Sequence, residues 1–235
     1  MNDPYRVRMP PDVQSVQIGD HQLIFIDDFL EHPEALLEAA CRSSFEPYPG
    51  LSERKGYPGV RAEAPSTYSQ NLTALVDPLI RLNFGVPEDL PLRKSMCGFS
   101  LTTATPEALG NLQRTPHFDA STPHHMAVLL YLCDARHGGT AFYRHRATGI
   151  QQVTAQNREA FLARYNDELT QRPPAARYFD QGDEHFEFLG RMPARFNRLV
   201  VYRGSLLHTA LINPELSINP DPRNGRLTVN TFFDF

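Results

Sequence analysis

The sequence predicts one α+β domain in which helices come first and short strands follow. Residues 32–43 and 71–84 carry apolar side chains at helical spacing. From residue 92 onward, most apolar residues fall instead in short runs of strand length. The 235 residues are enough for one sizeable hydrophobic core. Successive strands of this kind pack as a sandwich or a barrel.

The composition is that of a soluble globular protein, with 41% hydrophobic and 21% charged residues. The net charge of −4 and the lack of a basic stripe argue against a nucleic-acid partner. No run approaches the roughly 20 apolar residues of a membrane span, and residues 1–14 lack the apolar core of a signal peptide. Three scattered cysteines form no disulfide framework. We therefore expect a cytoplasmic protein without a membrane partner, and its oligomeric state, a homodimer included, stays open.

The first part of the chain is expected to contain a strand and two helices. Residues 22–29 form an apolar run of strand length, and 32–43 have a proline near the first turn of an amphipathic helix. The segment 47–66 is dense in Pro and Gly, which predicts a long loop of the kind that is often functional. Residues 71–84 predict a second helix, which Pro78 is expected to kink.

The second part is expected to consist of strands with one helical interruption. Residues 126–134 are a continuous apolar run typical of a buried strand, and 138–145 follow as a turn into another strand. Residues 154–169 place apolar side chains on one helical face, with Thr154 as the candidate N-cap. The final segment, 225–235, alternates polar and apolar residues at period two. Further strand-like runs lie at 92–105 and 195–208.

The segment RTPHFDAST at 114–122 places an imidazole and a carboxylate two residues apart. In an extended segment, residues i and i+2 project to the same side, so His117 and Asp119 can reach one metal ion. We expect His208 to be the third ligand, because an apolar strand and a Gly-Ser turn precede it; His185 is the rival. Two imidazoles and one carboxylate are the facial triad of mononuclear non-haem iron(II) sites. Taken singly, each residue also fits a polar loop or a strand-end histidine.

The final alternating segment points to an anion. It places Arg226, Thr228 and Asn230 on one face of a strand. A buried arginine is rare unless it is paired, and its planar fork suits a bidentate carboxylate, to which Thr228 can add a hydroxyl. Tyr131, inside a buried run, needs a partner for its hydroxyl, either a ligand carboxylate or a backbone carbonyl. The alternative is an arginine on the solvent face of an edge strand.

The order of these features resembles the 2-oxoglutarate and iron(II)-dependent dioxygenases, with the prolyl-4-hydroxylase-like branch nearest. The shared order is HFD, an apolar strand with a tyrosine, GGTAF, FNRLVVY, a distal histidine, and RLT in a last strand rich in aromatic residues. The resemblance covers residues 92–235 and implies a double-stranded β-helix, or jelly-roll, core there. Residues 1–91 would supply the N-terminal strand and helices, and about 145–194 a helical insertion over the mouth of the site.

The resemblance also implies the cofactor chemistry. His117, Asp119 and His208 would hold Fe(II), with 2-oxoglutarate as cosubstrate and O₂ as oxidant. Halogenating relatives have a small residue at the carboxylate position, so Asp119 favours hydroxylation or desaturation.

The resemblance assigns the cosubstrate as well. Arg226 would bind the distal carboxylate of 2-oxoglutarate, assisted by Thr228 and Tyr131. The link between the distal histidine and Arg226 is longer than the family leads us to expect, which leaves Arg223 as an alternative anchor.

The implied function is hydroxylation of a small molecule or of an amino-acid or peptidyl side chain. Arg61, Arg144 and Asn230 are candidates for binding polar groups of the substrate, although each also fits a solvated or scaffold position. Segments 57–61 and 143–145 are expected to rim the pocket. Two other functions stay open: a cupin-like metalloprotein that does not use 2-oxoglutarate, and a binding or sensing protein that keeps the fold without turnover. No G-x-S-x-G elbow is present, so serine hydrolysis is not expected.

Overall fold

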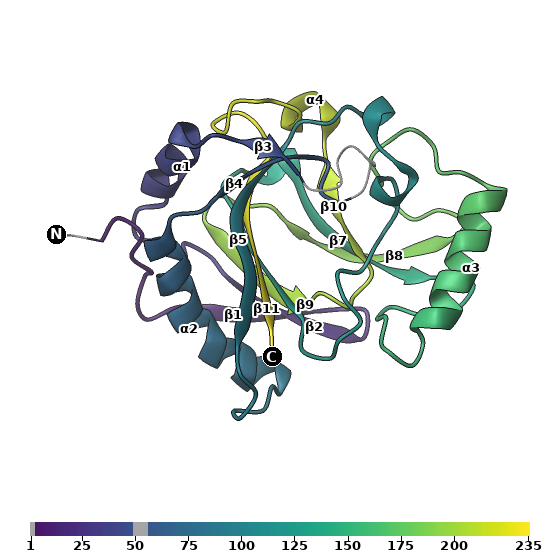
Figure 1. Cartoon of the computed structure of the whole chain (residues 1–235), viewed down its shortest axis with the longest axis horizontal. Helices are drawn as coiled ribbons and strands as arrows, with labels where there is room; N and C mark the ends of the chain where they lie inside the picture. The colour runs from purple at the N-terminus through teal and green to yellow at the C-terminus, as the bar shows by residue number, and fades with distance from the viewer. Residues whose placement is uncertain (1–2, 49–55) are drawn as a thin grey trace.

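The structure is a computed structural model that describes residues 3–48 and 56–235, and strands dominate it (Figure 1). The described strands pair antiparallel throughout and form two sheets. The large sheet has eight strands in the order β1-β2-β9-β6-β11-β5-β4-β3, and the small sheet has three in the order β10-β7-β8. This mixed, sheet-rich architecture with few helices confirms the α+β prediction at that level.

The strands of the large sheet are β1 (Val13–Ile18), β2 (His21–Ile26), β3 (Glu46–Pro47), β4 (Gly59–Glu63), β5 (Arg93–Thr102), β6 (Met126–Tyr131), β9 (Arg198–Arg203) and β11 (Leu227–Asp234). Those of the small sheet are β7 (Gly138–His145), β8 (Phe186–Pro193) and β10 (His208–Ile212). The α-helices are α1 (Pro33–Arg42), α2 (Ser66–Phe84), α3 (Arg158–Gln171) and α4 (Pro214–Ser217). Short 3₁₀ turns lie at Pro106–Ala108, Asn111–Gln113 and Ala135–His137.

The second half of the chain passes back and forth between the two sheets. β5 lies in the large sheet, and His117 then bridges to His208 at the edge of the small one. β6 returns to the large sheet, β7 and β8 lie in the small sheet, and β9, β10 and β11 alternate again. The two sheets therefore share one interior, which the last seven strands build together.

The continuous apolar run of β6 follows from its central place in the large sheet. Met126, Val128 and Leu130 belong to the core under α1 and α2. Ala127 and Tyr131, on the opposite face, belong to the core between the sheets. A strand covered on both faces has no solvent side, so its sequence does not alternate.

α1 and α2 cover the outer face of the large sheet, on the left in Figure 1. α2 begins at Ser66, five residues before the predicted start, and continues through Pro78. It ends at Gly85, whose φ of 64° is left-handed and whose N–H donates to the Arg81 carbonyl at 3.1 Å. Glycine takes that conformation without steric penalty, which is why the helix ends there. No helix of the described residues is both long and apolar enough to cross a membrane.

The structure differs from the sequence-based predictions in four places. The long loop expected at 47–66 contains β4, because the segment after Pro58 pairs with β5; its residues 49–55 lie outside the described part. The N-terminal strand is preceded by β1, which the sequence analysis missed. Residues 186–193 of the expected insertion 145–194 form β8, paired with β7, so the long part outside the sheets is 146–185. Thr154 is not the N-cap of α3, which is Asn157.

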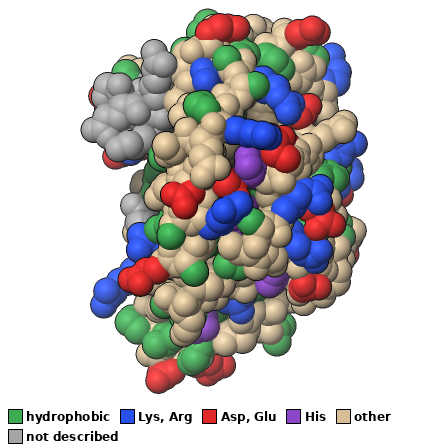
Figure 2. Space-filling model, turned by 90° about the vertical axis from the view of Figure 1, so that its right-hand side faces the viewer, with side chains coloured by type: hydrophobic (Ala, Val, Ile, Leu, Met, Phe, Trp, Pro, Cys, Tyr) green, Lys and Arg blue, Asp and Glu red, His purple; other side chains and the backbone are tan. Residues whose placement is uncertain are grey.

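Figure 2 shows the face on the α3 side, where cationic and anionic side chains are intermixed. Ion pairs on this side of the chain include Arg144 with Glu187 at 3.0 Å and Arg172 with Glu184 at 3.4 Å. Mixed, paired charges of this kind are typical of a solvated surface.

Candidate metal centre

Backbone pairing brings the two ends of the predicted cluster together. The His117 N–H donates to the His208 carbonyl at 2.9 Å, and the His208 N–H donates to the His117 carbonyl at 2.8 Å. This antiparallel bridge places the two imidazoles side by side, with ring centroids 4.6 Å apart. The Asp119 N–H donates to the Gly204 carbonyl at 2.7 Å, which ties the carboxylate-bearing residue to the turn before β10.

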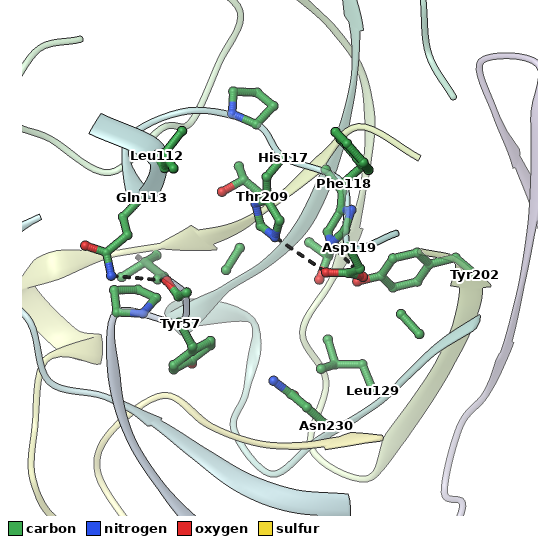
Figure 3. A pocket seen from close by; sticks show the side chains of 18 of the residues that line it. Tyr57, Leu112, Gln113, His117, Phe118, Asp119, Leu129, Tyr202, Thr209 and Asn230 are labelled. Carbon is green, nitrogen blue, oxygen red and sulfur yellow. Dashed lines mark hydrogen bonds and ion pairs between the residues drawn. The ribbon is translucent and has the colours of Figure 1, made fainter. Parts of the chain in front are cut away.

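The three side chains converge on one point, and Figure 3 shows His117 and Asp119 turned toward each other. Nε2 of His117 is 3.8 Å from Oδ1 of Asp119, and Nε2 of His208 is 3.6 Å from Oδ2. One ligand atom from each of the three residues lies within 4.8 Å of the other two. His185, the rival third ligand, lies elsewhere, with its Nδ1 3.2 Å from Glu168.

The hydrogen bond at Nδ1 of His208 determines which ring nitrogen can bind a metal. Nδ1 lies 2.8 Å from the Leu206 carbonyl, which can only accept, so Nδ1 carries the proton. Nε2 therefore presents its lone pair to the cluster. Such a bond to a carbonyl is the usual way in which a metal-binding histidine is oriented.

Burial keeps both imidazoles neutral. It lowers the pKa of His117 to about 4, with a further contribution from His208. It also lowers the pKa of His208 to about 4, although the bond to Leu206 acts in the opposite direction. Burial raises the pKa of Asp119, and its electrostatic interactions with His117 and His125 oppose that rise. Two neutral nitrogen donors beside a desolvated carboxylate form a site that a divalent cation would stabilise.

The cluster faces a cavity of about 520 Å³ between the sheets. Although 49% of the His117 side chain is accessible, it lines this cavity rather than the outer surface. Tyr202 lies beside Asp119, and Asn230 and Leu129 lie across from the cluster (Figure 3). Much of the wall is apolar or aromatic, including Phe118, Phe161, Leu162, Tyr165, Leu112 and Phe232. α3, the helix of the expected insertion, contributes three of these side chains.

Arg226 is a buried cation in the same cavity and is only 1% exposed. Its Nη1 donates to the Tyr57 hydroxyl at 3.0 Å, and its Nη2 donates to the Gly139 carbonyl at 2.9 Å. Its Nε is buried and has no partner, and the guanidinium forms no ion pair with any described residue. A buried guanidinium without a counter-ion is costly, so the site favours an anionic ligand.

Tyr131 lies close to that guanidinium, and Thr228 follows Arg226 by two residues in β11. The ring centroid of Tyr131 is 5.9 Å from the Arg226 guanidinium carbon, and its hydroxyl is hydrogen-bonded to the Thr140 hydroxyl at 2.6 Å. The Thr228 hydroxyl is buried and has no partner in the described structure. Tyr131 already has its hydrogen bond, and neither residue belongs to the described cavity lining.

Tyr57 is the residue that sequence reasoning missed at this end of the cavity. Its hydroxyl lies between Arg226 and the Thr102 hydroxyl, 2.9 Å from the latter. Tyr57 and Pro58 line the cavity, so the 57–61 segment rims it at its start. Only the Pro- and Gly-rich composition of the loop indicated a functional segment, and nothing in it singled out the tyrosine.

Of the other residues predicted to bind the substrate or the cosubstrate, Asn230 lines the cavity and the rest do not. Asn230 lines the cavity, its Nδ2 donates to Ser100 at 3.1 Å, and its Oδ1 is buried without a partner. Arg61 instead stacks 5.7 Å from the ring of Tyr48, and Arg144 pairs with Glu187. Neither belongs to the described cavity lining. Arg223 pairs with Glu38 at 2.9 Å, so its charge is already balanced.

The fold and site thus define a two-sheet protein with a two-histidine, one-carboxylate cluster in an interior cavity. Residues 9–233 match the family described as "Family of unknown function (DUF6445)", and the chain belongs to that family. No curated protein matches it.

Three solved structures are distantly similar. An oxidoreductase of the 2OG-Fe(II) oxygenase family from Burkholderia pseudomallei has 12% identity and a TM-score of 0.33, over 96% of this chain and 74% of that one. An N-substituted L-amino acid dioxygenase from Burkholderia ambifaria AMMD has 11% identity and a TM-score of 0.39, over 94% and 93%. The same dioxygenase in complex with alpha-KG has 11% identity and a TM-score of 0.30, over 90% and 81%.

Proposed function

We propose that the chain is an iron(II)- and 2-oxoglutarate-dependent oxygenase with a double-stranded β-helix core. One observation carries the proposal: a buried guanidinium without a counter-ion, Arg226, shares a cavity with a His-Asp-His cluster. A ligand that is anionic at one end and chelates a metal at the other satisfies both. The alternating passage of the chain from β5 to β11 between two antiparallel sheets supports the jelly-roll assignment.

The donor set fits Fe(II). His117 and His208 supply neutral nitrogens, and Asp119 supplies a carboxylate oxygen, which is the ligand set of the facial triad. His117 and His208 meet at the start of β10, Asp119 is bonded to the turn before it, and all three side chains line the cavity. Fe(II) bound there would supply the activation of O₂ that is coupled to oxidative decarboxylation of 2-oxoglutarate.

The chain's own groups orient the cosubstrate. Arg226 binds the distal carboxylate of 2-oxoglutarate through its guanidinium, and Tyr57 and Thr228 add hydroxyls beside it. The distance between Arg226 and the cluster selects a diacid long enough to reach both. The aromatic wall from Phe118 and α3 limits the access of water to the reacting atoms.

The finer assignment is a hydroxylase of the prolyl-4-hydroxylase-like branch. Asp119 keeps a carboxylate where halogenating enzymes have a small residue, which favours hydroxylation. The substrate is a small molecule or an amino-acid or peptidyl side chain, with Asn230 as its polar contact. The expected location is the cytoplasm, without a nucleic-acid or membrane partner.

The test separates binding from turnover. Anaerobic calorimetry should show 2-oxoglutarate binding to the Mn(II)-loaded chain and not to the metal-free chain. Addition of Fe(II), ascorbate and O₂ should then release succinate. A cupin-like protein would bind the metal without 2-oxoglutarate, and a sensor would bind both without succinate. Failure of 2-oxoglutarate to bind the metal-loaded chain would overturn the proposal.

A further inference from the structure

His125 forms a partly buried pair with a residue far along the sequence. Its Nδ1 lies 2.7 Å from Oδ1 of Asp234, and its ring stacks on Phe232 with centroids 5.4 Å apart. A carboxylate can only accept, so the Nδ1–H donates to Asp234. The histidine is 9% exposed, whereas 40% of the Asp234 side chain is accessible. The pair therefore runs from the C-terminal end of β11 into the interior.

The other end of this imidazole faces the metal cluster. Its Nε2 is buried and has no hydrogen-bond partner among the described residues. Gly204 separates His125 from Asp119: its N–H donates to the His125 carbonyl at 2.9 Å, and its carbonyl accepts from the Asp119 N–H at 2.7 Å. A methyl group at Gly204 would lie 2.5 Å from Cδ2 of His125 and 2.9 Å from Oδ2 of Asp119. The imidazole edge and the carboxylate thus border one small gap.

We propose that His125 is a positioning residue for Asp119, with Asp234 holding the imidazole in place. The inference rests on the proposed function, since Asp119 is a metal ligand there. Cδ2 of His125 borders the gap beside the Asp119 carboxylate, and Nε2 is bonded to Cδ2. Nε2 is therefore the hydrogen-bonding atom of the ring on that side. When one carboxylate oxygen binds the metal, a water that donates one hydrogen to Nε2 and the other to the second carboxylate oxygen holds that oxygen in place. Outer-shell groups of this kind orient a ligand and strengthen it.

A merely structural role does not account for the arrangement. Stacking on Phe232 needs only a flat ring, and an apolar side chain would fill the same space without a buried polar atom. A buried nitrogen without a partner costs free energy, so its retention points to a partner present in the metal-bound state. Because Gly204 has no side chain, the gap between the His125 ring and the Asp119 carboxylate stays open.

Two amide substitutions separate the two ends of the imidazole. The side-chain amide of His125→Asn lies near the Nδ1 position, so this variant keeps the bond to Asp234 and loses the group that faces Asp119. The amide of His125→Gln lies near the Nε2 position, so this variant keeps the group that faces Asp119. The measurement is calorimetric titration of the metal-free full chain with Mn(II), without 2-oxoglutarate. Thermal unfolding of the metal-free variants reports any general loss of structure.

We expect His125→Asn to weaken Mn(II) binding about 10- to 100-fold. His125→Gln should stay within a few-fold of wild type, even if the two variants are equally stable. Asp234→Asn should weaken binding in the same direction and to a smaller extent. The inference is overturned if the Asn variant binds like wild type, or if both variants lose affinity equally. If the wild-type chain binds no Mn(II), the proposed function fails and the inference fails with it.

Discussion

The imidazole of His145 and the carboxylate of Glu168 form a hydrogen-bonded pair in the interior, 2.8 Å apart. His145 ends β7 and Glu168 lies on α3, so the pair joins the helix to the small sheet. The side chains are 0% and 5% exposed, and Arg164 adds a second bond to Glu168 at 2.7 Å. The pair holds in place the helix whose Phe161 and Tyr165 line the cavity.

Breaking this pair is expected to destabilise the chain. Glu168→Ala should lower the free energy of unfolding by about 3 kcal/mol, because it leaves a buried imidazole without its partner. Urea denaturation measures the change. Glu159→Gln is the matched control, since Glu159 is an exposed glutamate on the same helix and should stay within about 0.5 kcal/mol of wild type. A wild-type midpoint for Glu168→Ala would show that the pair does not hold α3.

The same pair predicts acid sensitivity. Burial acts to raise the pKa of Glu168, but the bonds and charges of His145, His185 and Arg164 outweigh it and hold the pKa below its ordinary 4.5. A carboxyl with a lowered pKa contributes stability above its unfolded pKa, and that stability is lost as the pH falls through the folded pKa. The free energy of unfolding should therefore drop below about pH 4.5, less steeply in Glu168→Gln. Urea titrations across this range check it, and equal slopes in both proteins would contradict it.

Loss of a ligand is expected to abolish the proposed reaction. His117→Ala or Asp119→Ala removes one of three donors, so Mn(II) affinity should fall by more than the roughly 10- to 100-fold typical of outer-shell substitutions. Iron-dependent succinate release should stop. His32→Ala, which removes an exposed imidazole, is the control and should change neither measurement. If either variant still binds Mn(II) like wild type, the metal binds at another place in the chain.

The anion anchor is expected to act on 2-oxoglutarate and not on the metal. Arg226→Ala should raise the half-saturating 2-oxoglutarate concentration by about 10- to 100-fold, as loss of a charge-assisted contact predicts. Tyr57→Phe, which removes one hydroxyl, should raise it by only a few-fold. Mn(II) affinity should not change in either variant. Arg223→Ala is the control for the alternative anchor, and an effect there with none at Arg226 would reverse the assignment.

Metal binding is expected to tolerate mild acid. Burial lowers the pKa of His117 and His208 to about 4, so both nitrogens remain unprotonated well below the ordinary histidine value of 6.5. Protons therefore compete with the metal for these two nitrogens only near pH 4, and burial raises the pKa of Asp119 above its ordinary value. Mn(II) affinity should change little from about pH 7 to pH 5 and then fall. A steep fall beginning just below pH 6.5 would contradict these lowered pKa values.

Part of the site could be predicted from short-range sequence patterns. The two-residue spacing of His117 and Asp119 is a property of extended backbone, and the run before His208 marks a strand that ends in a turn. The alternation of β11 likewise placed Arg226 and Asn230 on one face, and both line the cavity. These inferences needed only the periodicity of a few neighbouring residues.

Other parts depended on contacts between distant segments. The hydrogen bonds that join Tyr57 to Arg226 and His125 to Asp234 span 169 and 109 residues, and no local pattern marks such partners. Arg144 was expected at the pocket, but pairing of β7 with β8 gave it a carboxylate partner in Glu187.

The sequence by itself therefore determined which residue types could bind a metal and an anion, because spacing along a strand sets the side on which a side chain projects. Only the tertiary structure decided which of them meet, which arginine lacks a counter-ion, and which histidine lies behind Asp119. Those outcomes depend on how the two sheets are stacked and registered, and that is a property of the whole chain.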